Sequence, residues 1–139
     1  MTDVFVDTNV FIALVNSRDQ LHERAVADLS KLSRYRLVTT GAVLSESAFA
    51  LARPDQRARL VAFLDRLPVL PVVYDNETET RSRVFKWLAQ YAEHSPDYAD
   101  AELCVLAGRK PGTRIWTYDS EFKHVWRGAN GRRPRLIGA

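Results

Sequence analysis

Two aspartates in this sequence stand where parallel sheets build binding sites. Asp7 directly follows the apolar run Val4–Val6, and Asp119 directly follows the run 115–118. If both runs are strands of one parallel sheet, the two carboxylates lie at its carboxyl edge, where such sheets bind ligands. Helix capping is the structural alternative for each, because aspartate favours the residue before a helix or turn. Taken singly, either aspartate is explained by capping alone.

Glu46 is harder to explain as a surface residue. It is the only charged residue from position 37 to position 52, and its neighbours one helical turn away are Ala42, Phe49 and Ala50. These neighbours predict a partly buried carboxylate, which is costly unless it is paired or binds a metal. A salt bridge to an arginine from elsewhere in the chain is the alternative to metal binding.

Two further acids open a predicted helix over 99–107. Asp97 follows Pro96 and precedes the helical run, so it fits the N-cap position. Asp100 lies in the first turn, where the helix dipole favours a negative charge. The N-cap role of Asp97 leaves Asp100 free to face a site. We therefore assign Asp100 to the site and Asp97 to its support, and contact between Asp97 and a metal stays open.

Four carboxylates gathered at one sheet edge would repel one another and raise one another's pKa values. A divalent cation removes this conflict, and all-oxygen ligation favours Mg²⁺ or Mn²⁺ over Zn²⁺. Such a site polarises a phosphate and activates water, so phosphoryl chemistry is the natural reaction. The four proposed acids are Asp7, Glu46, Asp100 and Asp119. Neighbouring polar side chains that can orient water around the ion are Thr8, Asn9, Thr117 and Ser120.

Alternating strands and helices position these residues. Apolar runs predict strands at 4–6, 37–39, 69–74 and 115–118, and a short fifth at 136–137. Apolar stripes predict helices over 10–15, 20–32, 42–52, 56–67, 77–93 and 99–107, with Pro54 ending the third. Pro71 favours an edge position for the third strand. This alternation predicts an α/β fold with a central parallel sheet of four to five strands flanked by helices.

Composition narrows the class of protein. With 139 residues, 46% of them hydrophobic, the chain is expected to form one domain over residues 1–139. A single cysteine excludes an internal disulfide framework and a four-cysteine zinc site. Asp7 and Asn9 interrupt the longest N-terminal apolar run, which argues against a membrane span or a signal peptide. We expect a soluble cytoplasmic protein without membrane contact.

The net charge of +3 hides an uneven distribution, because basic residues concentrate after position 107. Such a basic quarter on a mildly acidic body is typical of a protein with a polyanionic partner. A solubilising surface is the alternative explanation.

At the acidic residues the sequence resembles the PIN-domain nucleases, and within them the small bacterial toxins of VapC type. Four segments in the family's order carry the resemblance: 4–10, Ser45–Glu46, 100–103 and 117–122. The resemblance implies a PIN-like α/β fold, an acidic pocket that binds Mg²⁺ or Mn²⁺, and endoribonuclease activity through metal-activated water. By motif position the pocket acids are Asp7, Glu46, Asp100 and Asp119, supported by Thr8 and Asn9. Similar toxins are held inactive by a cognate antitoxin and usually form homodimers.

An RNA substrate needs cationic contacts. The candidates are Arg114, Lys123, Arg127, Arg132, Arg133 and Arg135. Trp116, Phe122 and Trp126 are interleaved with them, and exposed aromatic rings among these would stack nucleobases. Trp116 also fits a core position in a strand, and the run 132–135 also fits a solvated tail.

Two other functions remain as alternatives. One is a non-catalytic RNA-binding PIN-like domain, against which all four acids argue. The other is a phosphotransfer receiver module, which needs an acidic pair at its first strand and a lysine after its last. Asp7 stands alone at its strand edge, and Glu46 comes from a helix. The sequence therefore favours a metal-dependent ribonuclease.

Overall fold

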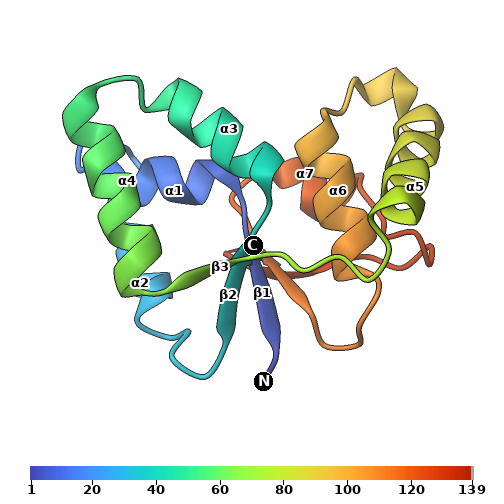
Figure 1. Cartoon of the computed structure of the whole chain (residues 1–139), viewed down its shortest axis with the longest axis horizontal. Helices are drawn as coiled ribbons and strands as arrows, with labels where there is room; N and C mark the ends of the chain where they lie inside the picture. Colours follow the sequence, from blue (N-terminus) through green and yellow to red (C-terminus); the bar gives the residue numbers. More distant parts are fainter. Residues whose placement is uncertain (139) are drawn as a thin grey trace.

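A five-stranded parallel sheet forms the centre of the molecule in the computed structural model, which describes residues 1–138 (Figure 1). Its strand order is β3-β2-β1-β4-β5, and every neighbouring pair is parallel. The α/β class and the parallel sheet are thus confirmed. The strands are β1 Asp3–Val6, β2 Arg36–Thr39, β3 Val69–Pro71, β4 Arg114–Trp116 and β5 Arg135–Ile137.

Helices flank this sheet on both sides, with α1, α3 and α4 on one side and α5, α6 and α7 on the other (Figure 1). Between residues 1 and 138, no helix is both long and apolar enough to cross a membrane. The helix bounds are α1 Thr8–Val15, α2 His22–Leu29, α3 Gly41–Ala50, α4 Pro54–Arg66, α5 Glu77–Gln90, α6 Tyr98–Ala107 and α7 Ser120–His124, with a 3-10 turn η1 at Ala92–His94.

The central strand β1 determines where the acids emerge. Phe5 pairs with Val38 on one side and with Ile115 on the other, so β1 has a hydrogen-bonded neighbour along both edges. Strands buried on both faces are apolar throughout, as β1 is from Val4 to Val6. The backbone N–H of Asp7 donates to the carbonyl of Trp116 at 3.0 Å. Asp7 therefore follows the middle of the sheet, beside the end of β4.

Element boundaries differ from expectation at several places. The expectation that Pro54 ends a helix is wrong, because α3 already ends at Ala50 and Pro54 begins α4. Proline suits the first helical turn, where its missing N–H would have no partner. β3 ends at Pro71 and lies at the sheet edge, where proline is tolerated. The helix expected over 77–93 stops at Gln90, and η1 leads to Ser95 in a left-handed conformation (φ 50°).

Candidate active site

Asp7 combines a cap and a site position. Its Oδ1 accepts the backbone N–H of Thr8 at 2.8 Å and so caps α1. Its Oδ2 accepts the hydroxyl of Thr117 at 2.8 Å and the amide of Asn9 at 3.3 Å. The side chain is buried, although a carboxylate is costly to bury. The capping explanation is therefore correct, and it covers only one of the two oxygens.

Thr117 and Asn9 join the ends of β1 and β4. The amide of Asn9 also donates to the Thr117 hydroxyl at 3.2 Å, and its Oδ1 accepts the backbone N–H of Tyr118 at 3.0 Å. The backbone N–H of Asp119 donates to Thr117 Oγ1 at 3.1 Å. This network holds the backbone at Asp119 next to the carboxylate of Asp7. Asn9 and Thr117, two of the residues assigned a supporting role, thus make direct contacts at the acids.

Asp119 is the N-cap of α7, and its Oδ1 accepts the backbone N–H of Glu121 at 2.9 Å. It is half-buried, and its negative charge contributes to raising the pKa of Asp7. Ser120 is the first residue of α7 and is exposed. Asp119 therefore caps a helix at the carboxyl edge of the sheet, close enough to Asp7 for the two charges to interact.

Asp97 and Asp100 form a reciprocal capping box at the start of α6. Asp97 Oδ1 accepts the backbone N–H of Asp100 at 2.8 Å, and Asp100 Oδ2 accepts that of Asp97 at 3.4 Å. The N-cap role of Asp97 is confirmed. Asp100 is less available to a ligand than expected, because its Oδ2 accepts the long hydrogen bond from the backbone of Asp97. Asp97 is exposed and Asp100 is half-buried.

Glu46 lies half-buried on α3, as its neighbours in the sequence predicted. It makes no ion pair with any residue from 1 to 138, so the salt-bridge alternative is not borne out. Burial, and then the charges of Asp97 and Asp7, raise the pKa of Glu46 to about 7. Glu46 is therefore within electrostatic reach of the acids that precede α6 and follow β1.

The same effect extends to Asp7 and Asp100. Burial raises the pKa of Asp7 to about 6 against the opposing hydrogen bonds from Thr117 and Thr8. Burial, followed by the charges of Asp97 and Asp7, raises the pKa of Asp100 to about 8. Mutual repulsion among carboxylates, expected from the sequence, is thus present at this edge of the sheet.

The donor set fits a hard divalent cation in chemistry and charge. All proposed ligands are carboxylates, and within 1–138 no arginine or lysine forms an ion pair with Asp7, Glu46, Asp100 or Asp119. The hydroxyl oxygen of Thr8, next to Asp7, is buried without a hydrogen-bond partner. The side chains of residues 1–138 nevertheless place no three acids, histidines or cysteines in a ready ligand group. Cation binding would therefore require movement of acids other than Asp7, whose carboxylate Thr117 and Asn9 hold in place.

The structure divides the candidate RNA contacts between two edges of the sheet. Lys123 belongs to α7, which Asp119 caps, and Arg127 follows that helix. Arg114 and Arg135 are the first residues of β4 and β5 and pair with each other. They therefore lie at the amino edge, opposite the acids. Arg132 and Arg133 belong to the loop that precedes β5.

The expectation that aromatic side chains among the basic residues stack on nucleobases is wrong. Trp116, Phe122 and Trp126 are all buried. Trp116 is on β4 inside the sheet, and Trp126 packs edge-on against Trp87 and Tyr91 of the α5 region. Their spacing among basic residues reflects core packing and not a stacking surface.

The chain belongs to the PIN domain family, whose model matches residues 4–127. It is similar to the crystal structure of VapC20 from Mycobacterium tuberculosis, a toxin that cleaves the sarcin–ricin loop, with 25% sequence identity and a TM-score of 0.65, over 86% of this chain and 92% of the other. Its fold is also that of VapBC2 from Rickettsia felis, solved with a DNA fragment from its promoter, at 12% identity and a TM-score of 0.64 over 97% of each chain. No curated protein sequence is significantly similar to it.

Proposed function

We propose that this protein is an endoribonuclease, the toxin of a toxin–antitoxin pair, which hydrolyses RNA phosphodiester bonds with water activated by a divalent cation. Residues 1–139 would form a single PIN domain. The observation that carries the proposal is the group of mutually repelling carboxylates at the carboxyl edge of the sheet, which no cation from residues 1–138 neutralises. Membership of the PIN family and similarity to an RNA-cleaving toxin support it.

Asp7, Glu46, Asp100 and Asp119 would hold Mg²⁺, or Mn²⁺ in its place. The bound cation would supply positive charge to the phosphate and make water a better nucleophile. Thr117 and Asn9 keep Asp7 in a fixed orientation. Without a cation, protons on Glu46 and Asp100 relieve the repulsion near neutral pH, since their pKa values are about 7 and about 8. Cation binding should therefore tighten as pH rises and release these protons.

Purified protein with labelled RNA in Mg²⁺ tests this function. We expect Asp7→Asn to lower the cleavage rate by about 100-fold or more, because even residues behind metal ligands contribute about 10–100-fold. The matched control is Asp65→Asn on α4, an exposed acid far along the chain from the site, which should cleave normally. Undiminished cleavage by Asp7→Asn, or full activity in EDTA, would refute the proposal.

A non-catalytic RNA-binding PIN-like domain is the second candidate. The absence of a ready three-ligand group among residues 1–138 favours it. The two functions differ in one measurement, because such a domain would bind RNA with strong salt dependence and leave it uncut in Mg²⁺ and in Mn²⁺.

We also propose a cognate antitoxin and a homodimeric state. Large apolar side chains that a partner would cover are exposed, among them Phe49 on α3 and Phe85 on α5, at 86% and 58%. Expression in a bacterial host should arrest growth, and Asp7→Asn should restore it. Light scattering of the purified protein measures its oligomeric state.

A further inference from the structure

A basic cavity lies at the amino edge of the sheet. It has a volume of about 270 Å³, is open to solvent, and is lined by the end of α6, the following loop 108–113 and the loop 128–134. No acidic residue among 1–138 lines it. The basic residues that line it are Arg109, Lys110, Arg132, Arg133 and Arg135.

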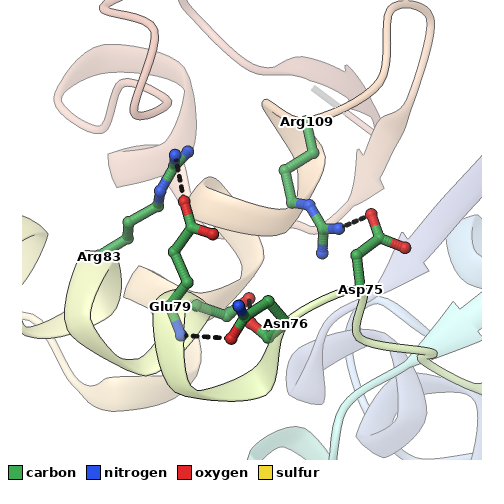
Figure 2. Close-up of polar contacts among 6 residues, drawn as sticks. Asp75, Asn76, Glu79, Arg83 and Arg109 are labelled. Carbon is green, nitrogen blue, oxygen red and sulfur yellow. Dashed lines mark hydrogen bonds and ion pairs between the residues drawn. The ribbon is translucent and has the colours of Figure 1, made fainter.

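Its positive charge is largely unneutralised. Arg109 forms an ion pair with Asp75, which precedes the N-cap Asn76 of α5, as Figure 2 shows. The other four cations make no ion pair with residues in the described part of the chain. The carboxyl end of α6 points at the cavity and contributes only about half a negative charge. The cavity therefore favours an anion.

The loop that carries two of the cations has a defined shape. The backbone N–H of Gly128 donates to the carbonyl of Arg132 at 2.8 Å, and that of Arg132 donates to Asn130 Oδ1 at 3.0 Å. Gly131 has a φ of 75°, which favours glycine. A Cβ atom at Gly128 would lie 2.9 Å from Asn130 Oδ1. This closed turn places Arg132 and Arg133 in the lining of the cavity with Lys110, and the guanidinium of Arg133 also donates to the backbone carbonyl of Lys123 at 3.2 Å.

The basic cavity and the acids occupy opposite ends of α6. Asp100 is in the first turn and Gly108 caps the last, so the two ends are separated by about 12 Å of helix axis. A stacked strand carries one phosphate per about 3.4 Å of axis, so this separation corresponds to about four nucleotides. One RNA strand of moderate length is therefore long enough to contact both sites.

We propose that the basic cavity binds backbone phosphates of the RNA strand, about four nucleotides from the cleaved bond. This inference rests on the proposed ribonuclease function and adds a second binding site to it. Phosphate is the favoured ligand because arginine and lysine hold it by charge and hydrogen bonds. The lining contributed by residues 1–138 contains no aromatic ring on which a base would stack. The cavity would position RNA without reading its sequence.

The test uses the double variant Lys110→Gln/Arg132→Gln. Both side chains are exposed and make no hydrogen bond or ion pair within 1–138, so the fold should survive, as circular dichroism will check. The matched control is Arg66→Gln/Lys86→Gln, which removes the same two charges from exposed positions on α4 and α5. Fluorescence anisotropy measures binding of a 16-nucleotide and a 3-nucleotide labelled RNA in EDTA, so that binding is read independently of cleavage.

We expect the cavity variant to bind the 16-nucleotide RNA at least about tenfold more weakly and the control variant to bind it normally. The plot of log K for RNA binding against the logarithm of the salt concentration should become less steep. Its slope should fall in magnitude by about 1.4, since each lost single-strand phosphate contact removes about 0.7. Binding of the 3-nucleotide RNA should not change. In Mg²⁺, KM for the long RNA should rise while kcat stays the same.

Two results would overturn the inference. One is normal binding of the long RNA by the cavity variant. Another is an equal loss for both lengths, accompanied by competition from inorganic phosphate, which would indicate a small-anion site. In the first case, lost binding of a 16-residue polyglutamate peptide by the same variant would assign the cavity to an acidic protein segment. A wild type that binds the long RNA through the cavity but never cuts it would contradict the proposed nuclease function instead.

Discussion

At the scale of single residues, Thr117 helps to stabilise the buried carboxylate of Asp7. Its hydroxyl donates to Asp7 and accepts the backbone N–H of Asp119. This bond opposes the effect of burial on the pKa of Asp7, which is still raised to about 6. The charged form of Asp7 is thus stabilised in part by a hydroxyl group of the residue that directly follows β4.

We therefore expect Thr117→Val to destabilise the protein by about 1–3 kcal/mol at pH 8, because it removes one of the three hydrogen-bond donors to a buried carboxylate. The pKa of Asp7 should rise above about 6. Thr117→Ser keeps the hydroxyl, so the stability of this variant and its Asp7 pKa should stay close to the wild-type values. Urea denaturation and a carboxyl NMR titration measure them, and equal behaviour of the Val and Ser variants would contradict the assigned role.

Glu46 offers a test in which stability and activity change in opposite directions. Its folded-state pKa is about 7 against an ordinary 4.5, so the folded state holds the proton more tightly. Stability is therefore lost as pH rises from about 4.5 through 7. In EDTA at pH 8, Glu46→Gln should be more stable than wild type by about 1 kcal/mol, after allowance for solvent screening of a half-buried group.

The two proteins should be equally stable below pH 4.5. The same variant should lose cation-dependent cleavage. Glu93→Gln, at an exposed position of η1, serves as the control and should follow the wild-type pH profile. A Glu46→Gln protein that is less stable than wild type at pH 8 would show that the carboxylate has a favourable partner.

At the scale of elements, the first turn of α6 serves both folding and the site. Asp97 caps the helix, and Asp100 returns the bond while facing the other acids. Asp97→Asn retains a capping oxygen and removes the charge, so stability should change little, whereas Asp97→Ala should cost about 1 kcal/mol. Thermal denaturation measures both variants.

The start of α6 also offers two aspartates, Asp97 and Asp100, as candidate ligands of the cation. Asp100→Asn should weaken Mn²⁺ binding by at least about tenfold. Asp97→Asn should weaken it less, because Asp97 is exposed and its carboxylate is engaged with the backbone of Asp100. Calorimetric titration compares the two, and a larger loss for Asp97→Asn would transfer the ligand role to Asp97.

At the scale of the whole molecule, the acidic edge makes stability depend on pH and on cations. The pKa values of Asp7 and Asp100 rise from 3.8 to about 6 and about 8, so both bind protons more tightly when folded. The free energy of unfolding in EDTA should therefore fall by a few kcal/mol between pH 4 and pH 8. Added Mg²⁺ should stabilise the protein more at pH 8 than at pH 5, because deprotonated acids bind it better.

Urea denaturation at both pH values, with EDTA and with Mg²⁺, measures this linkage. The quadruple substitution of the acids by their amides should flatten the pH profile and remove the effect of Mg²⁺. A stability that rises toward pH 8 in EDTA would contradict the mutual repulsion on which the site assignment depends.

Much of the fold and part of the site followed from local patterns. An apolar run ending in an acid predicted both the strand and the position of Asp7, and Asp97 was recognisable as a cap from Pro96 and the helix that follows. Boundaries were less predictable. Pro54 is compatible both with the end of one helix and with the start of the next. In the structure α3 ends before Pro54, because the chain turns at Leu51 and buries this side chain in the core.

The sequence by itself determined the parallel α/β fold and the acids at its carboxyl edge, because strand, cap and burial signals act between close neighbours in the chain. Tertiary structure alone decided which side chains reach the surface. Trp126 lies in the core beside Trp87, and Arg132 meets Lys110 in one cavity. These contacts join segments more than twenty residues apart. They depend on how α5, α6 and the loop before β5 pack, which periodicity within a single segment does not encode.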